Sequence, residues 1–403
     1  MGPVKENLRS TPRSLAGATI LQVVPALSDD PAGHAAVDIA LTLLQSGARA
    51  IIAGDGGPLV GDLRAFGGEW LPMQNDTFNP LRIRSNAATM AQLIAGERID
   101  IVHAQSAGAA RSAISATRRM PVFLVTSFPD QVAENSWPGT AFRASLARGD
   151  RVIAPSSYVS RAMIDRYKIS PERITVIPRS VDTAKFNPAA VSADRIAAMR
   201  RVWGVLPQMR VVLIAGRIAP WGGQMSVVEA ARLLVAAGDR NIAFVFAGED
   251  RGHAAYIKAL RARAQLHGID TLIRIAGVPA DMPAALAAAD VVATPALKPP
   301  PSGRVVAEAQ AIGRPVIATT VGVFPENLLC PPRMREDLRT GWLVRPNNVS
   351  ELARSIAAAL AMDVTAYEAL GARARQFAEF AFSPQSVAEA IRGVYTSLLA
   401  RDA

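Results

Sequence analysis

The sequence predicts an α/β protein made of two doubly wound domains, each with a parallel sheet covered by helices on both faces. The chain has 403 residues, more than one hydrophobic core usually accommodates. Short apolar runs alternate with amphipathic stretches along its length, as expected for buried parallel strands joined by helices. This alternation is interrupted between Pro178 and Pro188, where we place the interdomain linker.

Each element of the first half follows from local periodicity. Apolar residues at Ala36, Ile39 and Leu43 share one helix face, and Ser156 or Ser157 is a suitable N-cap. The strands that we expect are 20–26, 49–53, 99–103, 122–126, 151–154 and 174–177. The helices that we expect are 33–46, 81–96, 108–117, 140–147 and 156–168.

The second half repeats this arrangement. We expect strands at 211–215, 243–246, 273–275, 291–293 and 315–318, and helices at 224–237, 252–267, 302–312 and 350–360. Residues 1–183 and 184–383 form the two predicted domains, and a terminal helix within 384–403 returns to pack on the first. The carboxyl ends of the two sheets are expected to face a cleft, where ligands bind in doubly wound proteins.

Composition narrows the class of partner. The net charge is +10 and half of the residues are hydrophobic. A basic surface favours phosphate-bearing partners, although a general bias towards arginine explains the charge equally. No run of Lys and Arg occurs and no aromatic residues are interleaved with basic ones, so we expect no nucleic-acid binding.

The single cysteine, Cys330, excludes an internal disulfide and a cysteine-based metal site, and it suits a reducing compartment. The first 17 residues lack the apolar core of a signal peptide. No apolar stretch is long enough for a transmembrane helix. We therefore expect a cytoplasmic protein, and contact with the inner face of the membrane stays open.

Gly216 and Arg217 form the first candidate site, at the end of strand 211–215. A glycine there lets a ligand approach the backbone, and an arginine can donate two hydrogen bonds to a phosphate. The alternative is a turn glycine followed by a surface arginine.

The start of helix 302–312 is the second candidate. Ser302 is the expected N-cap, and the free backbone N–H groups at Gly303, Arg304 and Val305 would point at an anion. Glu308 lies in the first two turns and could accept a hydrogen bond from a ribose hydroxyl. The alternative is an ordinary capped helix.

His103 is the third candidate, since it ends a strand that faces the expected cleft. A buried histidine with satisfied hydrogen bonds fits the pattern as well as a substrate contact does. No pair of histidines has the spacing of metal ligands, so we expect no protein-bound metal and no cofactor.

Taken together, these motifs resemble glycosyltransferase family 4, and the resemblance spans nearly the whole chain. It is most specific at 306–311, 313–318 and 340–344. It implies the GT-B fold, in which two Rossmann-like domains face a cleft, and retaining transfer of a hexose from a nucleotide-sugar such as a UDP- or GDP-hexose. It also implies a glycan or lipid-linked acceptor in the first domain, no metal, and a role in bacterial envelope polysaccharide or lipopolysaccharide synthesis.

The chain departs from the family pattern at four places. The family's phosphate-binding lysine falls on Gly222, and the first of its two glutamates falls on Pro300. Its first Gly-Gly loop is here 29–32, Asp-Asp-Pro-Ala, and its catalytic-site histidine falls on Pro129 in the stretch Phe128-Pro129-Asp130. Three lost charge-assisted contacts forfeit roughly 5–9 kcal/mol of binding or transition-state stabilisation.

Two hypotheses follow. In the first, this copy is catalytically impaired or inactive and serves as a binding partner, for example of an active relative. In the second, it is a working transferase with a rearranged donor site, in which Arg217, Glu308 and Glu326 hold the donor and Lys298 replaces a lost group. A sensor of sugars or nucleotides is a third reading.

Overall fold

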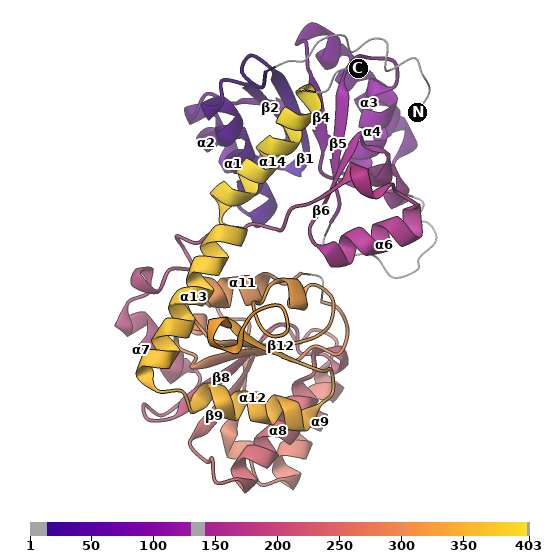
Figure 1. Cartoon of the computed structure of the whole chain (residues 1–403). Helices are drawn as coiled ribbons and strands as arrows, with labels where there is room; N and C mark the ends of the chain where they lie inside the picture. The colour runs from indigo at the N-terminus through magenta and orange to yellow at the C-terminus, as the bar shows by residue number, and fades with distance from the viewer. Residues whose placement is uncertain (1–13, 130–141, 301, 401–403) are drawn as a thin grey trace. The chain divides into compact units, whose positions relative to one another are not determined.

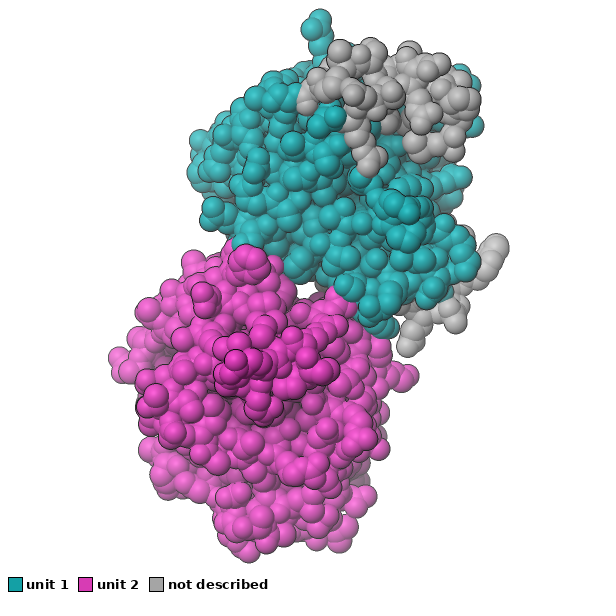
Figure 2. All heavy atoms as spheres, in the orientation of Figure 1, with its two compact units in different colours: residues 1–180, 384–403 teal, residues 181–383 magenta. Residues whose placement is uncertain are grey.

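The computed structural model describes residues 14–129, 142–300 and 302–400 (Figure 1). The chain divides into two compact units, which Figure 2 shows in different colours. Unit 1 comprises residues 1–180 and 384–403, and unit 2 comprises residues 181–383. Both units are α/β.

Unit 1 contains a seven-stranded parallel sheet in the order β3-β2-β1-β4-β5-β6-β7. Its strands are β1 (Thr19–Ala26), β2 (Arg49–Asp55), β3 (Glu69–Pro72), β4 (Ile101–Ala104), β5 (Phe123–Ser127), β6 (Arg151–Ala154) and β7 (Ile174–Val176). Its helices are α1 (Pro31–Gln45), α2 (Leu59–Ala65), α3 (Pro80–Gly96), α4 (Ala107–Thr117), α6 (Ser157–Tyr167) and α14 (Pro384–Leu399), with short 3-10 turns η2 (Ala144–Arg148) and η3 (Pro171–Arg173).

Alternate strand residues of unit 1 point to opposite faces of the sheet. Ile101 and Val125 belong to the cluster that α1 and α14 cover, and Tyr395 of α14 is fully buried there. Val102 and Leu124 belong to the cluster on the other face, which includes residues of α3, α4 and α6. Buried faces on both sides explain why these strands read as continuous apolar runs.

Unit 2 contains a six-stranded parallel sheet in the order β10-β9-β8-β11-β12-β13. Its strands are β8 (Arg210–Ala215), β9 (Ile242–Ala247), β10 (Ile273–Gly277), β11 (Val291–Thr294), β12 (Val316–Thr319) and β13 (Gly341–Val344). Its helices are α7 (Ala193–Val202), α8 (Gln224–Ala236), α9 (Ala254–Leu266), α10 (Met282–Ala287), α11 (Arg304–Ala311), α12 (Val349–Leu360) and α13 (Val364–Phe382). Its 3-10 turns are η4 (Pro188–Ala190), η5 (Pro220–Gly222), η6 (Asp270–Leu272), η7 (Phe324–Glu326) and η8 (Glu336–Leu338).

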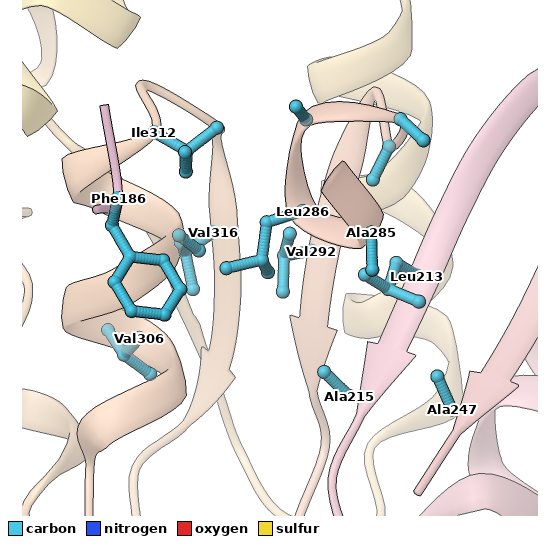
Figure 3. Close-up of a cluster of buried hydrophobic side chains, with 14 of the residues drawn as sticks. Phe186, Leu213, Ala215, Ala247, Ala285, Leu286, Val292, Val306, Ile312 and Val316 are labelled. Atoms are coloured by element: carbon cyan, nitrogen blue, oxygen red, sulfur yellow. The ribbon is translucent and has the colours of Figure 1, made fainter. Parts of the chain in front are cut away.

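One core cluster of unit 2 joins the sheet to α10 and α11 (Figure 3). Phe186, from the segment that precedes η4, is almost fully buried in this cluster together with Val306 of α11 and Val316 of β12. The opposite face of the sheet packs against α8, α9 and α12. The segment that we read as a linker therefore contributes to the core of unit 2.

The sequence analysis did not predict several of the described elements and misplaced several boundaries. It missed α2, β3, α7, α10, β13 and α13. The helix expected from residue 33 begins at Pro31, because Asp30 caps it and proline suits the first helical position. Part of the helix expected at 140–147 lies outside the described residues, and η2 occupies the described remainder. In the ranges that the structure describes, no helix is long and apolar enough to span a membrane.

Candidate functional site

Gly216 and Arg217 leave the carboxyl end of β8, as the alternation of strands predicts. Gly216 has a φ of +141°, and Arg217 is exposed over 59% of its side chain. Arg217 Nη2 donates to Glu249 Oε2, which follows β9, over 3.2 Å. The guanidinium is therefore held at this edge of the sheet by a surface ion pair that an anionic ligand could displace.

Gln224 occupies the space beside Gly222, the position at which the resemblance led us to expect a lysine. The Gln224 side chain is buried, and its Nε2 donates to the carbonyl oxygen of Arg217 over 2.9 Å. A Cβ at position 222 would lie 2.5 Å from Gln224 Oε1. Gln224 Oε1 has no hydrogen-bond partner in the described part of the chain. Any larger residue at position 222 thus requires Gln224 to move.

Gly223 fixes this loop against the loop that follows β11. Its φ is +78°, and a Cβ there would overlap the carbonyl group of Pro295. The N–H of Leu297 also donates to the carbonyl oxygen of Trp221 over 2.8 Å. Only glycine allows so close an approach in this conformation. The loops after β8 and β11 are therefore packed directly against each other.

The N-cap of α11 is Gly303, so the expectation of a Ser302 cap is wrong. Gly303 supplies no side-chain cap, and Asn327 Nδ2 donates to its carbonyl oxygen over 3.2 Å. A side chain at position 303 would collide with Asn327. Arg304 and Val305 are the first residues of the helix. The start of α11 therefore has no side-chain cap, and backbone N–H groups at such a helix start suit an anion.

Glu308 lies on α11 and is only 6% exposed. Burial raises the pKa of its carboxyl group, and the charge of Arg304, whose Nε donates to Glu308 Oε1 over 2.6 Å, opposes this effect. Lys185 also favours the charged form. The carboxylate that we expected to bind a ribose is thus paired within its own helix.

The loops after β11 and β12 contain the remaining candidates of unit 2. Lys298 is exposed and Pro300 is half-buried in the loop after β11. Glu326 ends η7 and is half-buried. A Cβ at Gly322 would lie 2.9 Å from Pro299, so these two loops pack against each other. All of these residues lie on the same edge of the sheet as Arg217, because the strands are parallel.

In unit 1, Asp30 occupies the start of α1. Its Oδ1 accepts hydrogen bonds from the N–H groups of Ala32 and Gly33, both over 2.9 Å. Pro31 has no N–H to offer. Asp29 pairs with His34 over 2.8 Å. A carboxylate of the protein itself therefore uses the N–H groups that a bound phosphate would need.

His103 of β4 is only 1% exposed, and protein groups contact both of its ring nitrogens. Nδ1 lies 2.6 Å from the Tyr395 hydroxyl, and Nε2 lies 2.7 Å from Ser127 Oγ. Burial, together with the charge of Arg179, lowers the pKa of His103 to about 3. This geometry favours the interpretation of His103 as a satisfied core histidine over that of a catalytic base.

The stretch that follows β5 contains position 129, at which the resemblance led us to expect a histidine. Phe128 is buried and Pro129 is half-buried, whereas Asp130 lies outside the described residues. Arg179 Nη2 donates to the carbonyl oxygen of Phe128 over 3.3 Å. No proton-transfer group takes the place of the family's histidine at position 129.

An open depression of about 580 Å³ lies where β3 ends and α3 begins. Its polar lining consists of Gln74, Asn79, Arg82, Ser85, Asn86 and Thr89. Sequence reasoning missed this depression, and it also missed Gln224, Ser127 and Tyr395. The Asp30–Pro31 pair was a local signal for a helix N-cap, whereas Tyr395 lies too far along the chain from His103 for any local pattern to reveal the contact.

Comparisons with known proteins agree with this architecture. Residues 34–185 match the model described as Glycosyltransferase Family 4, and residues 209–362 match the model described as Glycosyl transferases group 1. The two segments together span about three quarters of the chain.

Curated and solved relatives lie in the same group. A D-inositol 3-phosphate glycosyltransferase of Geodermatophilus obscurus is 31% identical over 265 residues, 62% of this chain and 53% of that protein. The matches span about two fifths to half of the length of the curated relatives. A glycosyltransferase from Rickettsia africae has a TM-score of 0.77 at 26% identity, over 95% of this chain and 99% of the other. Anabaena Alr3699/HepE in complex with UDP has a TM-score of 0.71 at 22% identity, over 94% and 100%.

Proposed function

Because the chain belongs to the glycosyltransferase family 4-like proteins of the GT-B fold, we propose that it is a copy impaired in sugar transfer, which acts as a binding partner of an active transferase. The proposal concerns only activity and partners. It rests on four positions at which this chain lacks a group that the family pattern supplies, and on what fills the space at two of them.

The Asp30 carboxylate carries this proposal. A donor diphosphate at the start of α1 would have to displace it from the N–H groups of Ala32 and Gly33. The displaced carboxylate would stay tethered nearby and would repel the phosphates. Asp29 adds a second carboxylate in the same loop. This helix start is therefore unsuited to the role that a Gly-Gly loop has in the family.

The donor side of unit 2 supports the same conclusion. Gly222 brings no cation, and Gln224 fills the space beside it with a neutral amide. Pro300 brings no carboxylate to the position that faces the donor sugar in the family. Phosphate neutralisation is left to Arg217, which is paired with Glu249. A retaining transfer that depends on charge stabilisation of the leaving diphosphate would be slow.

A transferase with a rearranged donor site is the second candidate. The start of α11, without a side-chain cap, favours it, together with Glu308 in the second turn. In that case the backbone from Gly303 to Val305 and Arg217 would stabilise the diphosphate, and Glu308 would bind the ribose. Lys298 would have to supply the charge that Gly222 lacks.

We propose that this chain and its partner transferase act in bacterial envelope polysaccharide or lipopolysaccharide synthesis. The acceptor of the sugar would be a glycan or a lipid-linked molecule. Exposed Phe78 and Leu81 stand beside Arg82 and Arg84 at the start of α3, which suits peripheral contact with an anionic leaflet. The curated relatives are named for D-inositol 3-phosphate, so acceptor tests include that compound.

Calorimetric titration with UDP, GDP, ADP and their hexose conjugates tests the proposal. We expect no binding at millimolar ligand, and we expect the tagged full chain to form a stable complex with a family 4 transferase of the same cell. Micromolar binding that Arg217→Ala abolishes would overturn the impairment. Arg251→Ala is the matched control, since Arg251 pairs with the same Glu249 and is far more exposed.

A restoration experiment distinguishes the effect of the missing charged groups from the effect of the space that Gln224 occupies. Gly222→Lys with Pro300→Glu returns both charges, but the lysine must displace Gln224 from the carbonyl of Arg217. We expect donor affinity to rise more when Gln224→Ala is added to this pair. Equal affinity of the double and triple variants would show that Gln224 does not limit the site.

A further inference from the structure

Three polar side chains form a hydrogen-bonded chain through the interior of unit 1. Ser127 Oγ lies 2.7 Å from His103 Nε2, and His103 Nδ1 lies 2.6 Å from the Tyr395 hydroxyl. Ser127 and His103 stand at alternate positions with Val125 and Ile101, so all four point to the face that α14 covers. These two hydrogen bonds therefore link α14 to the carboxyl end of β5.

His103 is neutral in the folded protein, because its ring is buried and desolvated. A neutral imidazole donates through one nitrogen and accepts through the other. If Nδ1 carried the hydrogen, the Tyr395 oxygen would accept it and the phenol hydrogen would need another acceptor. Tyr395 is fully buried, and in the described part of the chain its hydroxyl forms a hydrogen bond with His103 alone. That arrangement leaves a buried donor unpaired, which is unfavourable.

The other arrangement satisfies every buried atom. Tyr395 donates to Nδ1, and the Nε2–H group donates to Ser127 Oγ. Ser127 Oγ then accepts from His103, which leaves its O–H and its second lone pair for other partners. Ser127 is the last residue of β5 and is partly exposed. Its hydrogen is therefore directed away from the core, at the sheet edge where doubly wound domains bind ligands.

A positive charge lies near the same edge. Arg179 donates to the carbonyl oxygen of Phe128, the residue after Ser127, and its charge reaches His103. A hydroxyl whose hydrogen is directed outward, close to a guanidinium, favours an oxygen that bears negative charge. A neutral sugar hydroxyl gains less from the charge of Arg179 than an anionic oxygen does.

We propose that the Ser127 hydroxyl donates a hydrogen bond to an anionic oxygen of the acceptor substrate, a phosphate or a carboxylate, and that His103 and Tyr395 are its positioning residues. This proposal rests on the assignment of the acceptor to unit 1. It does not require sugar transfer, so a binding partner that has lost its activity would keep the same subsite.

The tautomer of His103 gives the first test. Nitrogen-15 NMR of the full chain, with the ring signals assigned by their loss in His103→Gln, reports which nitrogen carries the hydrogen at neutral pH. We expect the Nε2–H tautomer in the native protein and a mixture in Tyr395→Phe. A native Nδ1–H tautomer would overturn the proposal, whether or not the protein transfers sugar.

Ligand binding gives the second test. D-inositol 3-phosphate and inorganic phosphate are titrated against the full chain, with myo-inositol as the neutral comparison. We expect at least one anion to shift the His103 signals, and Ser127→Ala to weaken its binding on the order of tenfold. Ser160→Ala, on α6, should have no effect.

Equal anion affinity in the two serine variants would overturn the proposal, and so would the absence of binding by both anions. The transferase assignment is judged separately, because donor titration reports on unit 2. A neutral polyol that binds as tightly as its phosphate would also contradict an anionic preference.

Discussion

Lowering the pH from 7 to 5 is expected to destabilise unit 1 through His103. The pKa of His103 is about 3 in the folded protein and 6.5 for the unperturbed side chain. Between these two pKa values the unfolded chain binds a proton on His103 that the folded chain does not bind. Protonation in the folded state would place a charge in a desolvated site close to Arg179. The stabilisation is complete above pH 6.5 and is lost as the pH falls towards 3. The loss of stability amounts to about 2 kcal/mol at pH 5 and roughly 4–5 kcal/mol at the lower limit.

Urea denaturation of the full chain, followed by circular dichroism at pH 7, 6 and 5, measures this effect. Carboxylates titrate over the same range, so the informative quantity is the difference in free energy of unfolding between the native chain and His103→Gln. Glutamine can still donate and accept at this position but does not titrate. We expect the native advantage to shrink by about 2 kcal/mol between pH 7 and pH 5. Parallel pH dependences for the two proteins would refute the reasoning.

Three further substitutions have expected outcomes. Tyr395→Phe leaves His103 Nδ1 buried without a partner and should lower the free energy of unfolding by about 1–3 kcal/mol in urea melts at pH 7. Gly223→Ala should lower the free energy of unfolding in thermal melts by on the order of 2 kcal/mol or more, because its Cβ overlaps a neighbouring carbonyl group. Gly238→Ala, also at positive φ but in open space, should lower it less. Asp30→Ala removes the cap of α1 and should cost about 1 kcal/mol by chemical denaturation. A neutral outcome for Asp30→Ala would mean that water replaces the carboxylate.

The sheet strands could be predicted from the sequence because burial on both faces makes them apolar throughout. Ile101 and Val102 lie on opposite faces, and both are fully buried. Two of the missed elements, β3 and α10, lack such a signal. β3 is only four residues long and half-buried, and α10 is a six-residue helix with a proline in its first turn. Such elements are ordered by the packing of neighbours that are distant in sequence, so local periodicity does not reveal them.

The candidate site was predictable to the same extent. The positions of Gly216, Arg217 and Glu308 follow from strand ends and a helix start, which a parallel architecture brings to one edge. The contacts that Tyr395 and Gln224 make could not be predicted from the sequence. Tyr395 meets His103 because α14 returns to unit 1, and Gln224 reaches the Arg217 carbonyl through a turn that only the fold defines.

The departures from the family pattern are structurally accommodated, and this bears on how they can be reversed. Where the family has glycines, Asp30 satisfies the N–H groups of α1 with its own carboxylate. Where the family has a lysine, Gln224 packs beside Gly222 and holds the Arg217 carbonyl. Both arrangements contribute hydrogen bonds that a substitution towards the expected family residue would break. Restoring one charge therefore adds attraction for a diphosphate and removes local stability at the same time. It follows that donor affinity should depend on combinations of substitutions and not on the sum of single ones.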